Sequence, residues 1–206
     1  MARRYDDRSI QRRDPSRQPK IRILVVCEGK KTEPIYLRQF QHHVRNPRVH
    51  VEPLGPAGVP VTVVQTAIDL RKQAADEARR QRDENLLWDQ VWAVFDMDDH
   101  PNVADARQLA SAHGIRLAVS NPCFELWALL HFSDQRAYIE RGKLRAALQQ
   151  HMPGYDKELP FAKVHTGYRE AVHRARELDH AATRAGRPGR NPTTGVHLLT
   201  EIIRTQ

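Results

Sequence analysis

Residues 21–29 read Ile-Arg-Ile-Leu-Val-Val-Cys-Glu-Gly, an apolar, β-branched run that ends in a carboxylate and a glycine. A run that is apolar on both faces is typical of an interior strand in a parallel sheet, because helices cover both sides of such a strand. Thr32 follows, and its hydroxyl can cap a helix that carries Glu33 in its first turn. The stretch therefore predicts a strand, a loop and a helix at the start of the fold.

Predicted strands and helices continue to alternate along the chain as far as Ser133. The pattern predicts further strands over 48–53, 91–95 and 115–119, and helices over 61–82, over 102–113 and after Asn121-Pro122. Apolar strands that alternate with helices build a mostly parallel sheet flanked by helices, so we expect an α/β fold.

Beyond Ser133 the sequence predicts only polar helices, over 143–151, 161–185 and 194–204, and no strand. We therefore divide the chain into a flexible basic arm over 1–20, an α/β domain over 21–133, and a helical extension over 134–206 that packs on it.

Composition narrows the class of partner. Of the 206 residues, 33 are Lys or Arg and 25 are Asp or Glu, giving a net charge of +8. This excess favours a polyanionic partner such as nucleic acid, although much of it lies in residues 1–20 and 184–190, where a solvated segment is the simpler interpretation.

The apolar runs are too short to cross a membrane and the amino terminus lacks the apolar segment of a secretory signal, so we expect a cytoplasmic location. With only Cys27 and Cys123, neither a disulfide framework nor a four-ligand zinc site can form, and both read as small buried hydrophobes.

Acidic side chains follow three of the predicted strands. Glu28 follows the first, Asp96, Asp98 and Asp99 follow the third, and Glu125 comes shortly after the fourth. The carboxyl ends of parallel strands meet at one edge of a sheet, and residues two apart on extended backbone point to the same side. Carboxylates gathered in this way can hold Mg²⁺, or Mn²⁺, together with a substrate phosphate.

Each of these residues also has a simpler interpretation. In this interpretation Asp98 and Asp99 do no more than cap the following helix, and Glu28 does no more than pair with Lys30 or Lys31. In the functional interpretation Glu28 is the general acid/base and Gly29 allows close substrate approach. Lys30 and Lys31 then bind substrate phosphates, or are merely solvated. Asn121 shapes the turn before Pro122, with an amide that can orient a carboxylate or bind substrate.

Four segments resemble the RloB family, which includes a component of an abortive-infection system. They are Val-Val-Cys-Glu-Gly-Lys-Lys-Thr-Glu-Pro-Ile-Tyr (25–36), Val-Phe-Asp-Met-Asp-Asp (94–99), Ser-Asn-Pro-Cys-Phe-Glu-Leu-Trp-Ala-Leu-Leu-His-Phe (120–132) and Asn-Pro-Thr-Thr (191–194). The first two are shared more widely with Toprim domains. The resemblance implies a Toprim-like sheet in which Glu28 acts in acid/base catalysis and Asp96 and Asp98 bind Mg²⁺. Asp99 and Glu125 are candidates for further ligands, or for groups that contact the ligands.

The resemblance also implies a function. The function that it implies is that of a Mg²⁺-dependent endonuclease that acts on DNA or tRNA in bacterial anti-phage defence and works with an ATPase partner protein. The alternative is a non-catalytic nucleic-acid-binding or regulatory subunit of a defence complex. A phosphatase of the haloacid-dehalogenase type fits poorly, since its Asp-x-Asp follows the opening strand, and the chain lacks a P-loop. A homo-oligomer is left open.

Overall fold

The computed structural model describes residues 20–97, 102–156 and 158–206. Its centre is a sheet with the strand order β2-β1-β3-β4-β5. The four parallel strands are β1 (Ile21–Cys27), β2 (Val49–Leu54), β3 (Gln90–Asp96) and β4 (Arg116–Asn121), and β5 (Thr193–Thr194) pairs antiparallel with β4. The predicted α/β fold with a mostly parallel sheet is therefore confirmed.

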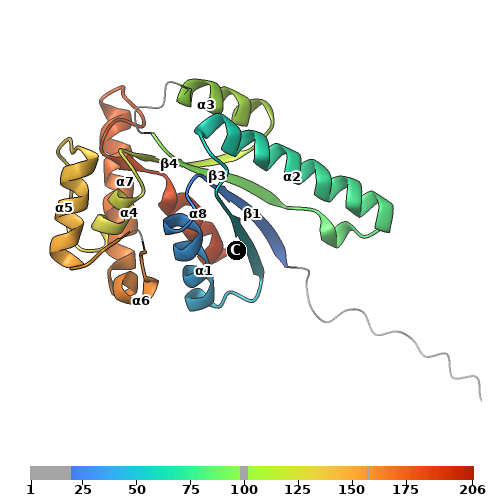
Figure 1. Ribbon diagram of the computed structural model, residues 1–206, viewed down its shortest axis with the longest axis horizontal. Helices are drawn as coiled ribbons and strands as arrows, with labels where there is room; N and C mark the ends of the chain where they lie inside the picture. The colour runs from blue at the N-terminus through green and yellow to red at the C-terminus, as the bar shows by residue number, and fades with distance from the viewer. Residues whose placement is uncertain (1–19, 98–101, 157) are drawn as a thin grey trace, which may run out of the picture.

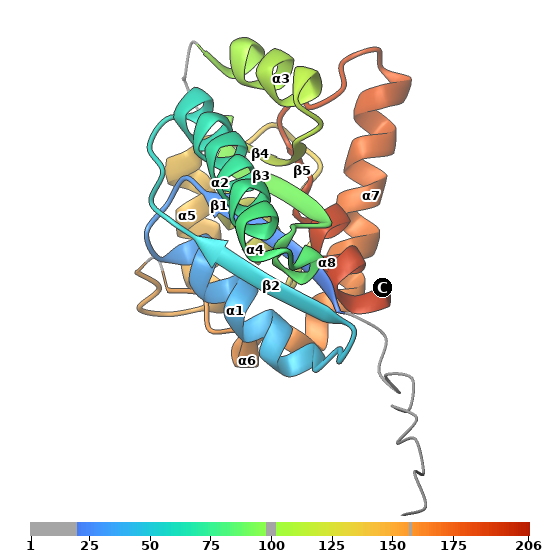
Figure 2. The same ribbon diagram turned by 90° about the vertical axis from the view of Figure 1, so that its right-hand side faces the viewer.

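Helices cover both faces of this sheet, with α2 and α3 on one side and α1 and α8 on the other (Figures 1 and 2). Alternate residues of β1 explain the uniformly apolar run: Ile23 and Val25 belong to one hydrophobic cluster, whereas Leu24 and Val26 belong to the other. Both faces of the strand are buried, so neither can be polar. The bounds of these helices are α1 (Thr32–Val44), α2 (Pro60–Gln81), α3 (Val103–Ala112) and α8 (Val196–Thr205).

The remaining helices extend the α1 side of the sheet. They are α4 (Glu125–Leu130), α5 (Arg141–His151), α6 (Phe161–Val164) and α7 (Tyr168–Arg184), with the short 3-10 helix η2 (His165–Gly167). Another 3-10 helix, η1 (Glu84–Leu86), follows α2 and contacts it. Leu144 of α5, Leu178 of α7 and Trp127 of α4 belong to the same buried cluster as Ile23 and Val94. The helices after Ser133 thus share a core with the strands.

Three local predictions were wrong. The segment after Ser133 contains a strand, because Thr193 and Thr194 pair with the end of β4 before α8 begins at Val196. The helix expected over 161–185 is interrupted by η2 at Gly167, whose α-carbon lies so close to the backbone carbonyl of His131 that no side chain fits. Thr32 is the first residue of α1, not its cap, since Lys31 occupies the cap position.

Within the described ranges, no helix is both long enough and apolar enough to span a membrane.

Candidate active site at the carboxyl ends of the strands

A pocket of about 340 Å³ opens where β1, β3 and β4 end. The topology places it there, because the loops and helix starts that follow parallel strands converge at this edge of a sheet. We call it the acidic pocket; it is lined by Glu28, Gly29, Lys30, Lys31, Thr32, Glu33, Asp96, Phe124, Glu125 and Arg141.

Glu28 reaches across from the end of β1 to the end of β3. Its backbone N–H donates to the carbonyl of Val94 (2.9 Å), and its Oε2 accepts from the backbone N–H of Asp96 (2.9 Å). Glu28 is therefore fixed beside Asp96 although 68 positions separate them in the chain.

Asp96 is the last residue of β3, and only 7% of it is exposed. Its Oδ1 accepts from the backbone N–H of Phe124 (2.9 Å), and Nη2 of Arg141 donates to its Oδ2 (3.2 Å). Burial raises the pKa of Asp96 well above its usual value, and the carboxylates of Glu33 and Glu125 add to the shift, while Arg141 opposes it. A second cation near Asp96 would therefore stabilise its ionised form.

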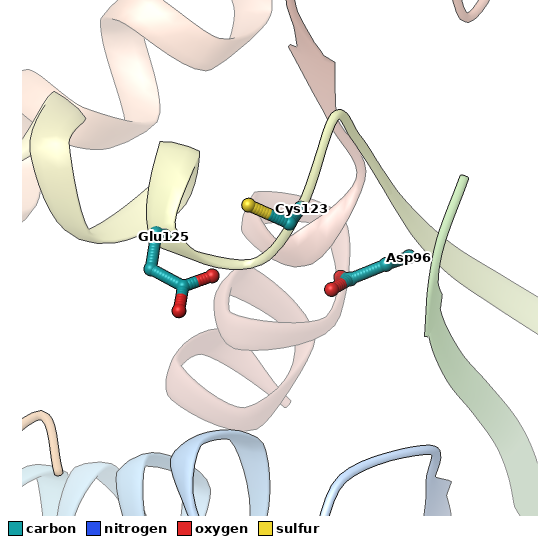
Figure 3. Close-up of side chains that lie close together, drawn as sticks. All are labelled: Asp96, Cys123 and Glu125. Carbon is teal, nitrogen blue, oxygen red and sulfur yellow. The ribbon is translucent and has the colours of Figure 1, made fainter. Parts of the chain in front are cut away.

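Glu125 begins α4 and faces Asp96 across the turn after β4, with Cys123 between them in the chain (Figure 3). A carboxylate oxygen of each acid and Sγ of Cys123 all lie within 4.8 Å of one another, so this buried cluster could bind a metal ion. The hydroxyl of Tyr155 donates to Oε1 of Glu125 (3.4 Å). Burial, followed by the charges of Glu125 and Asp96, raises the pKa of the Cys123 thiol, so it stays protonated and the oxygens are the better ligands for a hard cation.

Glu33 brings a further carboxylate into the pocket from the first turn of α1. It is 6% exposed, and burial raises its pKa, with the charges of Glu125 and Glu28 adding to the shift. A methyl group added at Gly29 would meet the Glu33 carboxylate, so glycine lets the loop pass this close without displacing that side chain. The spacing of Glu28 and Glu33 offered a signal for this role, because the first turn of a helix after a strand lies at the same edge of the sheet.

The structure brings together most of the predicted site residues that it describes. Lys30 and Lys31 line the acidic pocket, and Nζ of Lys31 lies 3.6 Å from Oε1 of Glu158 on the surface. Asn121 lies elsewhere: its amide donates to the carbonyl of Gly189 (2.8 Å) and to Sδ of Met97 (3.2 Å). Asp98 and Asp99 fall outside the described residues. The roles assigned to all these residues stay predictions.

Sequence reasoning missed Arg141, because the start of α5 carries no motif and lies 45 positions after Asp96. It also missed Cys123 as a neighbour of the carboxylates, having assigned it only to the core. The segment Cys123-Phe124-Glu125 directly after a strand end was the available signal.

The fold and the pocket together define an α/β protein with a parallel sheet and an acidic, ligand-sized pocket at its strand ends. The family model described as RloB-like protein matches residues 23–203, and the chain belongs to this family. Comparison with curated proteins and with solved structures gives no significant match. The resemblance to the RloB family is thus confirmed, while the relationship to Toprim domains stays a prediction.

Proposed function

We propose that the chain is a divalent-metal-dependent endonuclease that cleaves DNA or tRNA in the acidic pocket. The single observation that supports this most is the convergence of Glu28, Glu33, Asp96 and Glu125 on one pocket at the strand ends. Buried like charges in close proximity are unfavourable unless protons or cations neutralise them, so such a cluster is common at functional sites.

The donor atoms fit Mg²⁺ or Mn²⁺, which prefer carboxylate oxygens and keep several water ligands. Asp96 and Glu125 would hold the ion, since a carboxylate oxygen of each lies within 4.8 Å of the other. A divalent ion there would stabilise negative charge on a phosphate undergoing hydrolysis.

The surrounding residues supply the other requirements of phosphodiester cleavage. In the proposal Glu28, fixed by its hydrogen bond to the Asp96 amide, transfers the proton of the attacking water or of the leaving oxygen. Lys30, Lys31 and Arg141 border the same pocket and bind the substrate phosphate, while Gly29 leaves room for it.

The test is cleavage of total tRNA and of plasmid DNA with Mg²⁺, with Mn²⁺ and with EDTA. We expect Glu28→Gln and Asp96→Asn each to reduce the rate about a hundredfold or more, with the fold retained by circular dichroism. Asp76→Asn is the matched control, because this exposed carboxylate on α2 lies outside the acidic pocket. Cleavage by both pocket variants at the wild-type rate would refute the proposal.

A second candidate, a non-catalytic nucleic-acid-binding or regulatory subunit, has one observation in its favour. Arg141 supplies a positive partner for Asp96 at 3.2 Å, so protein atoms alone can balance part of the charge. Two measurements separate these candidates. In a calorimetric titration the endonuclease should bind Mn²⁺, and Asp96→Asn should remove that binding. In a binding and cleavage assay the subunit should bind nucleic acid without metal-dependent turnover.

Membership of the RloB family is consistent with a role in defence. We extend the proposal to a cytoplasmic anti-phage system in which an ATPase partner activates this chain. Co-expression with the ATPase partner should then increase cleavage, and Glu28→Gln should remove the increase.

A further inference from the structure

Exposed arginines gather at the end of α7 and in the loop that leads to β5. Arg184, Arg187 and Arg190 are exposed, and Arg107 of α3 packs against the same loop at Gly189. We call these four residues the arginine surface. Within the described ranges, none of the four makes an ion pair with an acidic side chain, so their charges remain available to a partner.

A small pocket of about 110 Å³ lies beside this surface. Arg184 and Arg190 line it together with Arg136 and Arg174, against the acids Asp134 and Glu177. Arg136 pairs with Asp134 (2.6 Å), and Arg174 donates to the backbone carbonyl of Leu130 (2.6 Å). Positive charge therefore predominates, and since the exposed Arg136 is paired with Asp134, the exposed charge that no acid in the described part of the chain balances comes from Arg184 and Arg190.

The arginine surface lies at the same edge of the sheet as the acidic pocket. Because β5 runs antiparallel to β4 and pairs Thr193 with Asn121, the residues before β5 lie at the carboxyl end of β4. The Asn121 amide fixes them there through its 2.8 Å hydrogen bond to Gly189. In Figure 1 the loop between α7 and β5 lies at the end of the sheet away from the last turns of α2, and Figure 2 shows it beside α3.

Tyr138 is 71% exposed, more than the other exposed large hydrophobic side chains of the described residues. The next residue, Ile139, is joined to the Asn191 side chain by two hydrogen bonds. The Ile139 N–H donates to Oδ1 of Asn191 (3.1 Å), and the Asn191 amide donates to the Ile139 carbonyl (2.8 Å). Three residues after Tyr138, Arg141 contacts Asp96, and three residues span at most about 11 Å. The exposed ring is thus held near both the loop of the arginine surface and the acidic pocket.

We propose that Tyr138 and the arginine surface bind single-stranded nucleic acid and lead it into the acidic pocket. Guanidinium groups contact successive phosphates, and the phenol ring stacks on an unpaired base. A duplex keeps its bases inside the helix and offers no exposed face to a lone surface ring, so the pair of features favours a single strand or an unpaired loop. The inference rests on the proposed function, for which it specifies the substrate class.

Binding is measured in EDTA by fluorescence anisotropy with a labelled single-stranded oligonucleotide, so that no cleavage is needed. Tyr138→Ala should weaken binding about tenfold, and Tyr138→Phe should leave it within about twofold, because phenylalanine retains the stacking face. The duplex of the same sequence should bind more weakly and should not respond to Tyr138→Ala.

The phosphate contacts are tested with Arg184→Gln/Arg190→Gln. If each arginine contacts one phosphate, the slope of log affinity against log salt concentration should fall by about 0.7 per contact. The matched control is Arg79→Gln/Arg80→Gln on α2, which removes the same charge at the opposite end of the strands and should keep the wild-type slope.

Equal binding of wild type and Tyr138→Ala, duplex binding as tight as single-strand binding, or the same slope for both arginine pairs would overturn this inference. Its failure can be told from that of the proposed function, because the two use different readouts. A chain that binds a single strand through Tyr138 but never cleaves it retains this surface and loses the nuclease assignment. A chain that cleaves nucleic acid but binds it equally well after Tyr138→Ala retains the nuclease assignment and loses this surface.

Discussion

Gly29 brings the first loop close to the buried carboxylate of Glu33. A methyl group there would overlap Oε2, the far end of a flexible side chain, so the chain can accommodate alanine by moving the carboxylate. We expect Gly29→Ala to lower the cleavage rate about tenfold to a hundredfold, since small displacements in a site are costly. The unfolding temperature should change little, because no backbone atom has to move.

Gly142→Ala provides the comparison for this change. Gly142 lies in α5 with no neighbouring heavy atom within 4 Å of an added methyl group, and alanine in a helix is more stable than glycine by about 0.5–1 kcal/mol. This variant should cleave at the wild-type rate and unfold at an equal or higher temperature. If Gly29→Ala behaves in the same way, the position of Glu33 does not matter for the reaction.

His131 gives folding stability a pH dependence of known sign. It is 5% exposed; Nδ1 lies 2.8 Å from the Trp127 carbonyl and Nε2 lies 3.4 Å from the Tyr36 hydroxyl. Burial lowers the pKa of His131 to about 4. Between that value and the unfolded pKa of about 6.5, only the unfolded chain binds the proton. The free energy of unfolding therefore falls as the pH falls through this range, by roughly 3 kcal/mol in total.

Urea unfolding at pH 7 and at about pH 4.5 measures this loss. His131→Gln removes the titrating group, so this variant should lose less stability on acidification than wild type. His173→Gln, at an exposed position on α7, should lose as much as wild type. The buried carboxyls of Asp96 and Glu33, whose pKa values are raised, act in the opposite direction, but they are common to all three proteins and cancel in the comparison. Equal losses in all three would contradict the assignment to His131.

At the scale of elements, what the sequence predicted follows from burial. β1 and β3 are covered on both faces, so each had to be a continuous apolar run, and such runs are visible without a structure. β5 has only two residues and no periodicity to detect. Its position depends on pairing with β4 and on the 2.9 Å hydrogen bond between the hydroxyls of Ser120 and Thr194, 74 positions apart.

The residues of the candidate site also divide into those that the sequence predicts and those whose position depends on tertiary packing. Glu28 and Asp96 were predicted because each stands at the end of a strand, Glu28 directly after β1 and Asp96 as the last residue of β3, and parallel topology alone brings such positions to one edge. Arg141 and Tyr155 could not be placed, because their contacts with Asp96 and Glu125 depend on how the segment after Ser133 packs against α4. Asn191, part of a motif noted only for its resemblance, proves to hold Ile139 through both backbone groups.

For the molecule as a whole, the central question is whether the α/β part can exist without the helices that follow it. One buried cluster contains Val25 and Val94 of the strands together with Leu144, Leu178 and Ile203, which come after Ser133. Arg141, which contacts Asp96, also comes from the later part. The division at 133/134 therefore describes the character of the sequence, and independent folding of the two parts stays to be tested.

We expect a fragment of residues 20–133 not to fold, whereas residues 20–206, which hold all the described elements, should unfold in one cooperative transition. Without the later helices, large side chains such as Trp127 and Leu129 would lose cover, and burial of each such side chain contributes about 1.5–3 kcal/mol. A few such losses equal the whole stability of a typical domain, about 5–15 kcal/mol. Near-ultraviolet circular dichroism and dye binding during thermal unfolding measure the difference, because a collapsed fragment binds hydrophobic dyes and lacks fixed tertiary signals. A cooperative transition in the short fragment would instead show that the strands and α4 form a domain that folds by itself.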